Sequence, residues 1–215
     1  MEYVIEYGKA VQSVMTYTPT QILTFDGFIE QYSADSRYEL ADGELIDMEP
    51  TGPHETVAGK LTSKLNIEID KQQLPWVIPT RAILRPFANV ATARRPDVIV
   101  LDELALSQES LWQREPVITL ATSVKLVVEV VSTNWETDYA RKVEEYSLFG
   151  IAEYWIVDYL GLGGIAFIGR PKQPTITVCE LVGDEYQQQQ FRLGEKIVSR
   201  MFPELIMRLD DVLPR

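Results

Sequence analysis

Cysteine and histidine are scarce in this chain, with one residue of each among 215. The single cysteine, Cys179, excludes an internal disulfide, and no cluster of cysteine and histidine indicates a zinc site. This usage fits a reducing compartment, so we expect a cytoplasmic protein. The first fifteen residues include Glu2, Glu6 and Lys9 and lack an apolar core, so we expect no signal peptide. No run of about twenty apolar residues is present, so we expect no membrane contact.

Basic residues are also few, 20 against 32 acidic ones, and the net charge of −12 argues against broad nonspecific binding of nucleic acid. The charges are unevenly spread: nine acids and one base lie between residues 26 and 55, whereas five bases and no acid lie between 71 and 96. The basic stretch is either part of a polarised solvated surface or a local anion-binding patch. Its candidates for contacts with nucleic acid are Arg81, Arg85, Arg94 and Arg95.

The length and the apolar content of 46% suit one well-cored domain, which we place at residues 21–215 after an N-terminal arm over residues 1–20. Hydrophobic periodicity and turn residues predict an α/β (α+β) fold with a mixed central sheet flanked by helices. Asp42-Gly43 predicts an N-terminal hairpin over residues 38–48. The helices are expected at 25–32, 54–72, 108–112 and 135–148. The strands are expected at 96–101, 126–132 and 153–158, followed by an antiparallel meander of 165–168, 175–181 and 186–192. A last strand or turn is expected within 202–213.

Glu129 lies inside the apolar run from Leu126 to Ser132, which is typical of a strand buried on both faces. A carboxylate in such a strand costs several kcal/mol unless it is paired, protonated or bound to a cation. Asp97 opens the neighbouring predicted strand, and Lys142 follows Asp138 by four residues on the next helix, so the last two share a face. Two carboxylates on strand ends with a nearby ammonium predict a Mg²⁺ or Mn²⁺ site.

Simpler interpretations of the same residues stay open. Glu129 and Lys142 could form a buried ion pair, and Asp97 could merely cap a strand end. Asp138 with Lys142 could be an exposed helix pair worth about 0.3–0.5 kcal/mol. His54, at the start of a predicted helix, is most simply a capping or surface residue, and its best functional interpretation is a group beside the cation that does not ligate it directly.

Pro96-Asp97, the buried Glu129 and a lysine together resemble the PD-(D/E)XK nuclease superfamily. The chain resembles more narrowly a restriction-endonuclease family abundant in cyanobacteria, over residues 20–213. The matching residues are Tyr38-Glu-Leu, Asp42-Gly-Glu-Leu, His54, Glu129-Val-Val-Ser132, Asp138, Lys142, Tyr146, Gly150, Glu153-Tyr-Trp155 and Val157-Asp158.

Two positions depart from these patterns. The superfamily lysine stands two residues after the glutamate, where this chain has Val131, so the resemblance implies that Lys142 replaces it from the following helix. The narrower family has Pro-Asp before the glutamate strand, where this chain has Val124-Lys125. We expect the second departure to affect a strand end and not the chemistry.

The resemblance implies a metal-dependent endonuclease that hydrolyses DNA, with Asp97, Glu129 and the Val130 carbonyl holding Mg²⁺ or Mn²⁺. Lys142 would hold the attacking water or the scissile phosphate, and Asp138 would orient Lys142 or lie outside the direct ligands. Glu44 and Glu49 are weaker candidates for that outer position. A homodimer is expected by analogy. The alternatives are a catalytically inactive binding or assembly module and a hydrolase of small phosphoesters; a continuous basic surface from Arg81 to Arg95 would favour DNA.

Overall fold

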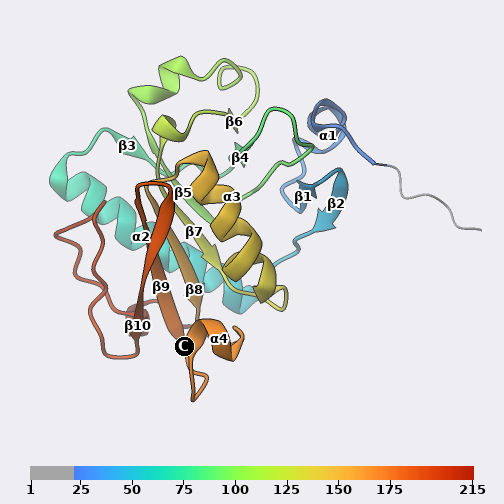
Figure 1. The fold of residues 1–215 in the computed structure, drawn as a ribbon. Coiled ribbons are helices and arrows are strands. Elements are labelled where there is room, and N and C mark those ends of the chain that lie inside the picture. The colour runs from blue at the N-terminus through green and yellow to red at the C-terminus, as the bar shows by residue number, and fades with distance from the viewer. Residues whose placement is uncertain (1–21) are drawn as a thin grey trace, which may run out of the picture.

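The computed structural model describes residues 22–215, so the N-terminal arm predicted for residues 1–20 lies outside the described residues. A mixed sheet of six strands in the order β10-β9-β8-β7-β5-β3 forms the centre of the molecule (Figure 1). Its strands are β3 (Trp76–Val77), β5 (Val98–Asp102), β7 (Val124–Val130), β8 (Glu153–Asp158), β9 (Thr175–Val182) and β10 (Glu185–Arg192). Strands β7 and β8 are parallel and the other neighbours antiparallel, so the predicted crossover is confirmed, as is the antiparallel pairing of the last two predicted meander strands.

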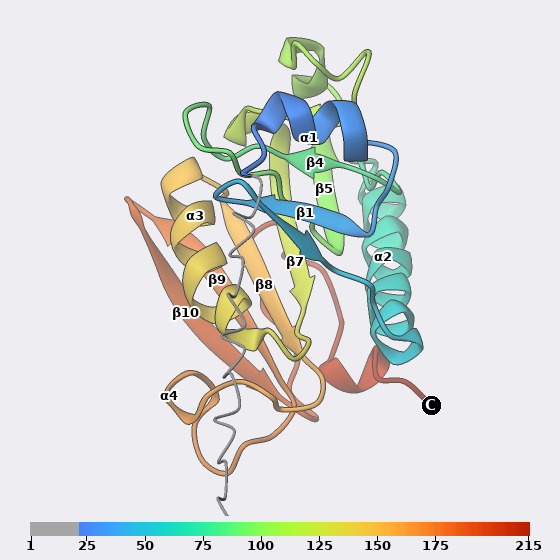
Figure 2. The same ribbon diagram turned by 90° about the vertical axis from the view of Figure 1, so that its right-hand side faces the viewer.

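Two helices cover opposite faces of this sheet, α2 (Gly52–Gln72) and α3 (Lys142–Phe149) (Figure 2). Leu61 and Leu65 of α2 pack with Val128 on one face. Tyr146 of α3 packs with Val127 on the other. Successive residues of β7 therefore point to different cores, which explains the uninterrupted apolar run. The predicted α/β fold with a mixed sheet between helices is confirmed.

A smaller unit stands beside the main sheet and has its own core, which includes Phe28, Leu40, Ile83 and Val117 (Figure 1). Its elements are α1 (Phe25–Tyr32), the antiparallel hairpin β1 (Tyr38–Ala41) and β2 (Glu44–Asp47), and the parallel pair β4 (Ile83–Leu84) and β6 (Val117–Ile118). The hairpin turns at Asp42-Gly43, where both residues have positive φ (51° and 83°), as predicted.

Two local predictions were wrong, and a third was confirmed except in its first turn. Residues 165–168 form the short helix α4 (Ile165–Ile168), not a strand, because four apolar residues carry no readable period and glycines bound them. The helix expected at 108–112 is a 3₁₀ turn at Ala105–Gln108. The helix expected at 135–148 begins as a π-helical turn, Thr137–Arg141, before α3.

The end of the chain, expected as a strand or turn, contains the 3₁₀ turn Leu209–Asp211. Across residues 22–215, no helix is both long and apolar enough to span a bilayer.

Candidate active site

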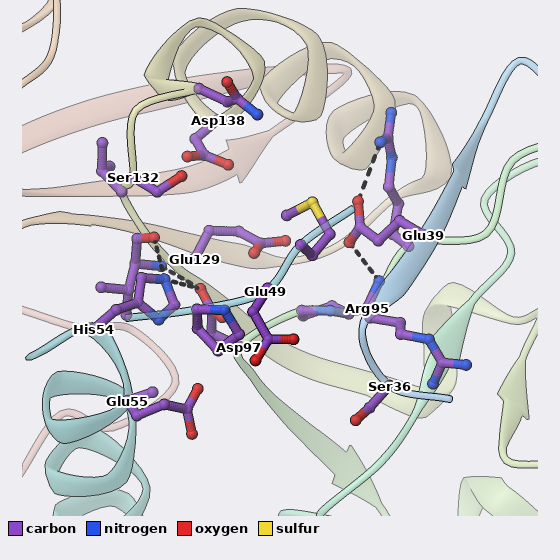
Figure 3. Close-up of a pocket in the computed structure, with 18 of the residues that line it drawn as sticks. Ser36, Glu39, Glu49, His54, Glu55, Arg95, Asp97, Glu129, Ser132 and Asp138 are labelled. Atoms are coloured by element: carbon purple, nitrogen blue, oxygen red, sulfur yellow. Dashed lines mark hydrogen bonds and ion pairs between the residues drawn. The ribbon is translucent and has the colours of Figure 1, made fainter. Parts of the chain in front are cut away.

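A cavity of about 1000 Å³ lies where the hairpin of the smaller unit faces the ends of β5 and β7 and the start of α2 (Figure 3). Each wall comes from a different part of the sequence, so the cavity exists only in the folded chain. The residues predicted for chemistry that line it are His54, Asp97, Glu129, Val130, Asp138 and Lys142. Glu49 also lines it, whereas Glu44 is exposed on β2 and does not.

Glu129 is buried near the end of β7 and is paired with Lys142, the first residue of α3. Lys142 Nζ lies 3.0 Å from Glu129 Oε1, and the Tyr146 hydroxyl donates to the same oxygen at 2.7 Å. The side chains of Glu129 and Lys142 are only 3% and 1% exposed. The ion-pair interpretation is therefore part of the structure.

Asp138 projects from the π-helical turn toward the same ammonium. Its Oδ1 lies 3.1 Å from Lys142 Nζ, and its carbonyl accepts a hydrogen bond from the Tyr154 hydroxyl at 3.0 Å. The pair is buried, so it is not the exposed surface pair of the simplest interpretation. Asp138 therefore fixes the position of the Lys142 ammonium next to Glu129.

The charges in this cluster do not balance. Burial raises the pKa of Glu129 to about 8 against the effect of Lys142, and the carboxylates of Asp97, Glu39 and Asp138 act in the same direction as burial. Burial also raises the pKa of Asp138. Burial alone would lower the pKa of Lys142, but the surrounding carboxylates raise it overall, so the ammonium stays charged. A further cation would relieve the excess of carboxylates.

Asp97 and His54 meet at the last residue of β7, Val130, just beyond the strand pairing with β5. Asp97 Oδ2 accepts from the Val130 N–H at 2.7 Å, and His54 Nε2 lies 2.8 Å from the Val130 carbonyl oxygen and 3.4 Å from Asp97 Oδ2 (Figure 3). Pro53, in the first turn of α2, helps to start the helix that carries His54. Burial would lower the pKa of His54, but Asp97 and the Val130 carbonyl raise it overall.

The predicted metal donors line the same cavity and are chemically suitable. Asp97, Glu129 and the Val130 carbonyl offer hard oxygens, and Mg²⁺ commonly takes one or two carboxylates and keeps several waters. Among residues 22–215, no three His, Cys, Asp or Glu side chains form a group that could hold a metal ion. The predicted donor set does not require such a group, because it contains two carboxylates and one main-chain oxygen.

The four arginines proposed for nucleic acid are used mainly within the fold. Arg94 is buried, donates to both Glu145 carboxylate oxygens at 2.7 and 2.8 Å, and contacts Glu39 at 3.4 Å. Arg95 donates to three main-chain carbonyls, and Arg85 donates to the Ala88 carbonyl. Arg81 is exposed but also donates to a main-chain carbonyl. They do not form a continuous free basic surface, and Arg94 has no surface to offer a phosphate.

Sequence reasoning missed the carboxylates that hold Arg94. Glu39 is buried in β1, and its Oε1 also accepts from the Arg95 N–H at 2.6 Å. Glu145 further accepts from Arg141 at 2.7 Å, one helical turn earlier. The spacing of Arg141 and Glu145 was a readable signal of a helix pair. Glu39 gave none, because alternation alone does not identify a strand residue that contacts another element.

A mixed sheet flanked by helices, with two carboxylates and a lysine near the ends of its inner strands, defines the class of restriction-endonuclease-like folds. The chain belongs to the family described as "Uma2: Putative restriction endonuclease", whose model matches residues 25–210.

The solved structures include a crystal structure described as "a putative nuclease belonging to DUF820", from Anabaena variabilis. It superposes with a TM-score of 0.63 at 16% identity, covering 88% of this chain and 97% of that one, which shows a shared fold. No curated protein matches the chain.

Proposed function

We propose that this protein is a metal-dependent endonuclease that hydrolyses phosphodiester bonds of DNA. The observation that carries the proposal is the meeting of Asp97, Glu129 and Lys142 in one cavity of a chain from this family. Their three types of group are those that a metal-assisted hydrolysis requires: two carboxylates for a cation, and an ammonium for a phosphate or water.

Each group has a distinct role in the proposal. Asp97, Glu129 and the Val130 carbonyl would hold Mg²⁺ or Mn²⁺, which would supply an activated water and offset charge on the phosphate. Lys142 acts as a point charge on the water or the scissile phosphate. Asp138 positions Lys142, and the Tyr146 hydroxyl fixes Glu129 by its hydrogen bond.

His54 keeps Asp97 and the Val130 carbonyl in place through its Nε2. Of the two weaker carboxylate candidates, Glu49 is the better placed for the cavity, because Glu44 does not line it.

A catalytically inactive binding module is the second candidate, and the arginine contacts favour it. Within the cavity lining, acids outnumber lysines and arginines, and Arg94 and Lys142 already have carboxylate partners. The same observations suit a hydrolase of small phosphoesters, which would use the cation site without a DNA groove. Cytoplasmic location and dimerisation remain predictions. The DNA proposal requires that the bound cation supply much of the positive charge that attracts the substrate.

The test is calorimetric titration with Mg²⁺ and Mn²⁺ of the wild type and of two variants. Glu129→Gln removes a proposed ligand and preserves its shape, while Glu55→Gln is a matched control at an exposed carboxylate of the same cavity. We expect the wild type and Glu55→Gln to bind the cation and Glu129→Gln to lose binding, with circular dichroism confirming the fold.

Cleavage of circular and linear DNA by the same proteins then tests the substrate. If the wild type binds no cation, the metal proposal is wrong. If it binds cations but cleaves only small phosphodiesters, the DNA assignment is wrong.

A further inference from the structure

The two edges of the central sheet differ in length and protection. At one edge β3 has two residues, whereas at the other β10 has eight. Natural sheets protect long edges with lysine, proline or bulges. Strand β10 contains no lysine or proline, and its pairing with β9 runs without a bulge from Glu185 to Arg192. Among residues 22–215, β9 is its only strand neighbour, so its outer edge offers a long template for pairing.

The hydrogen bonds of the meander show which β10 residues direct their main chain outward. Leu181, the partner of Tyr186, donates its N–H to Ala152 and therefore away from β10. At the other end, the N–H of Arg192 donates to the Glu195 side chain, and its carbonyl accepts from the Glu195 N–H. Because antiparallel pairs alternate, Tyr186, Gln188 and Gln190 direct their N–H and C=O groups to the open edge.

The side chains along this edge are neutral in the middle and charged near the ends. Residues 186–191 carry no charge, in a chain whose net charge is −12. Asp184 precedes the strand and Arg192 ends it. Within residues 22–215 neither forms an ion pair, although the Arg192 guanidinium donates hydrogen bonds to Thr175, Gln190 and the Ile168 carbonyl. An antiparallel copy of the same strand would therefore bring opposite charges together without placing like charges in the centre.

We propose that β10 pairs with β10 of a second copy of this chain, antiparallel about a two-fold axis at Gln188. A two-fold axis normal to the sheet places the same face of both copies on the same side of the joined sheet. Residues opposite each other must therefore be both even-numbered or both odd-numbered. Only one such register pairs all three residues whose main chain faces the open edge with one another. In it Gln188 lies opposite Gln188 of the second copy, and Tyr186 lies opposite Gln190. Each of these pairs exchanges two main-chain hydrogen bonds.

The ends of the strand support this register. It brings Asp184 opposite Arg192 of the second copy, so that the Asp184 carboxylate lies near a positive charge, while the Arg192 guanidinium keeps its hydrogen bonds to Thr175, Gln190 and the Ile168 carbonyl. It also brings Leu193, 44% exposed, toward the turn of the second copy that follows Val182, 46% exposed. The pairing stops before Arg192 because Glu195 already covers the main chain of that residue. The interface joins two sheets into one of twelve strands and does not depend on a metal.

The test places charge on the proposed axis. Gln188→Lys sets two lysines opposite each other, Gln188→Glu sets two glutamates, and a mixture of the two variants sets lysine opposite glutamate. Gln187→Lys is the matched control, because its opposing residue is Gln189 of the second copy. We measure the dimer dissociation constant by sedimentation velocity at low salt, and the composition of mixed dimers by native mass spectrometry.

We expect a wild-type dimer that is weakened about five-fold or more by either Gln188 variant and restored when the two are mixed, with Gln187→Lys close to the wild type. A wild type that stays monomeric at high protein concentration overturns the proposal. A dimer insensitive to both Gln188 variants also overturns it, because the interface then lies elsewhere. Equal weakening by Gln187→Lys and Gln188→Lys refutes the register. None of these results depends on whether the cavity binds a cation or cleaves DNA.

Discussion

Replacing Lys142 with methionine should strongly destabilise the metal-free protein. Methionine keeps most of the apolar stem of the lysine, so the change removes mainly the ammonium. The ammonium lies 3.0 Å from Glu129 and 3.1 Å from Asp138, and all three side chains are at least nine-tenths buried. Removing one partner of a buried ion pair leaves an uncompensated charge and costs about 3–5 kcal/mol. Loss of two contacts places the expected value in the upper part of that range.

The assay is urea denaturation at pH 8 with EDTA, comparing Lys142→Met with Lys125→Met. Lys125 forms a 2.9 Å ion pair with Asp102, and both side chains are partly exposed, so we expect its replacement to cost no more than about 1 kcal/mol. A loss below about 1 kcal/mol for Lys142→Met would refute the reasoning, because the two carboxylates would then need no cation. If the cavity holds Mg²⁺, magnesium at 100 times its dissociation constant should raise the free energy of unfolding by about 2.7 kcal/mol.

Three further predictions concern other charges of the structure. Burial raises the pKa of Glu129 from 4.5 to about 8, so the folded state binds an extra proton and the free energy of unfolding should fall as pH rises through that window, by at most about 1.4 kcal/mol per pH unit. Glu129→Gln should flatten this loss of stability. A difference in unfolding free energy, wild type minus variant, that grows with pH would contradict the prediction. Arg94→Met should cost about 3–5 kcal/mol in urea denaturation, because it leaves Glu39 buried without a cation and Glu145 with Arg141 alone. Arg37→Ala, at an exposed pair, should cost much less in the same assay, and equal losses would be inconsistent with the burial of Arg94. The DNA-binding constant, measured by fluorescence anisotropy, should depend only weakly on salt, with a log–log slope that corresponds to about one or two released counterions. A slope near that expected for about six phosphate contacts would contradict this, because it would require a continuous basic surface.

The elements with strong local signals could be predicted from the sequence. The Asp42-Gly43 turn requires positive φ at both residues, and this local demand alone locates the hairpin. The spacing of Leu61 and Leu65 identified α2 for a similar reason. The helix Ile165–Ile168 was missed because four residues complete about one helical turn, which gives no period to read.

The candidate site could be predicted only in part. Glu129 was identifiable because a carboxylate in an apolar strand requires compensation, and Lys142 because it shares a helix face with Asp138. The hydrogen-bond partners of the arginines could not be predicted. The partners of Arg95 are main-chain carbonyls of residues near α1, and such acceptors have no side-chain signature in the sequence.

The buried contacts of Arg94 have a consequence for how the molecule opens. One guanidinium joins Glu39 of β1 to Glu145 of α3, which belong to the two units on either side of the cavity. Separating these units would break at least one of the two buried ion pairs of Arg94, so the hairpin and the main sheet should unfold as one cooperative unit. Native-state hydrogen exchange should then give the Leu40 amide, bonded to the Ala93 carbonyl, the same opening free energy as amides of α3. A ligand must therefore enter a cavity whose two walls move together.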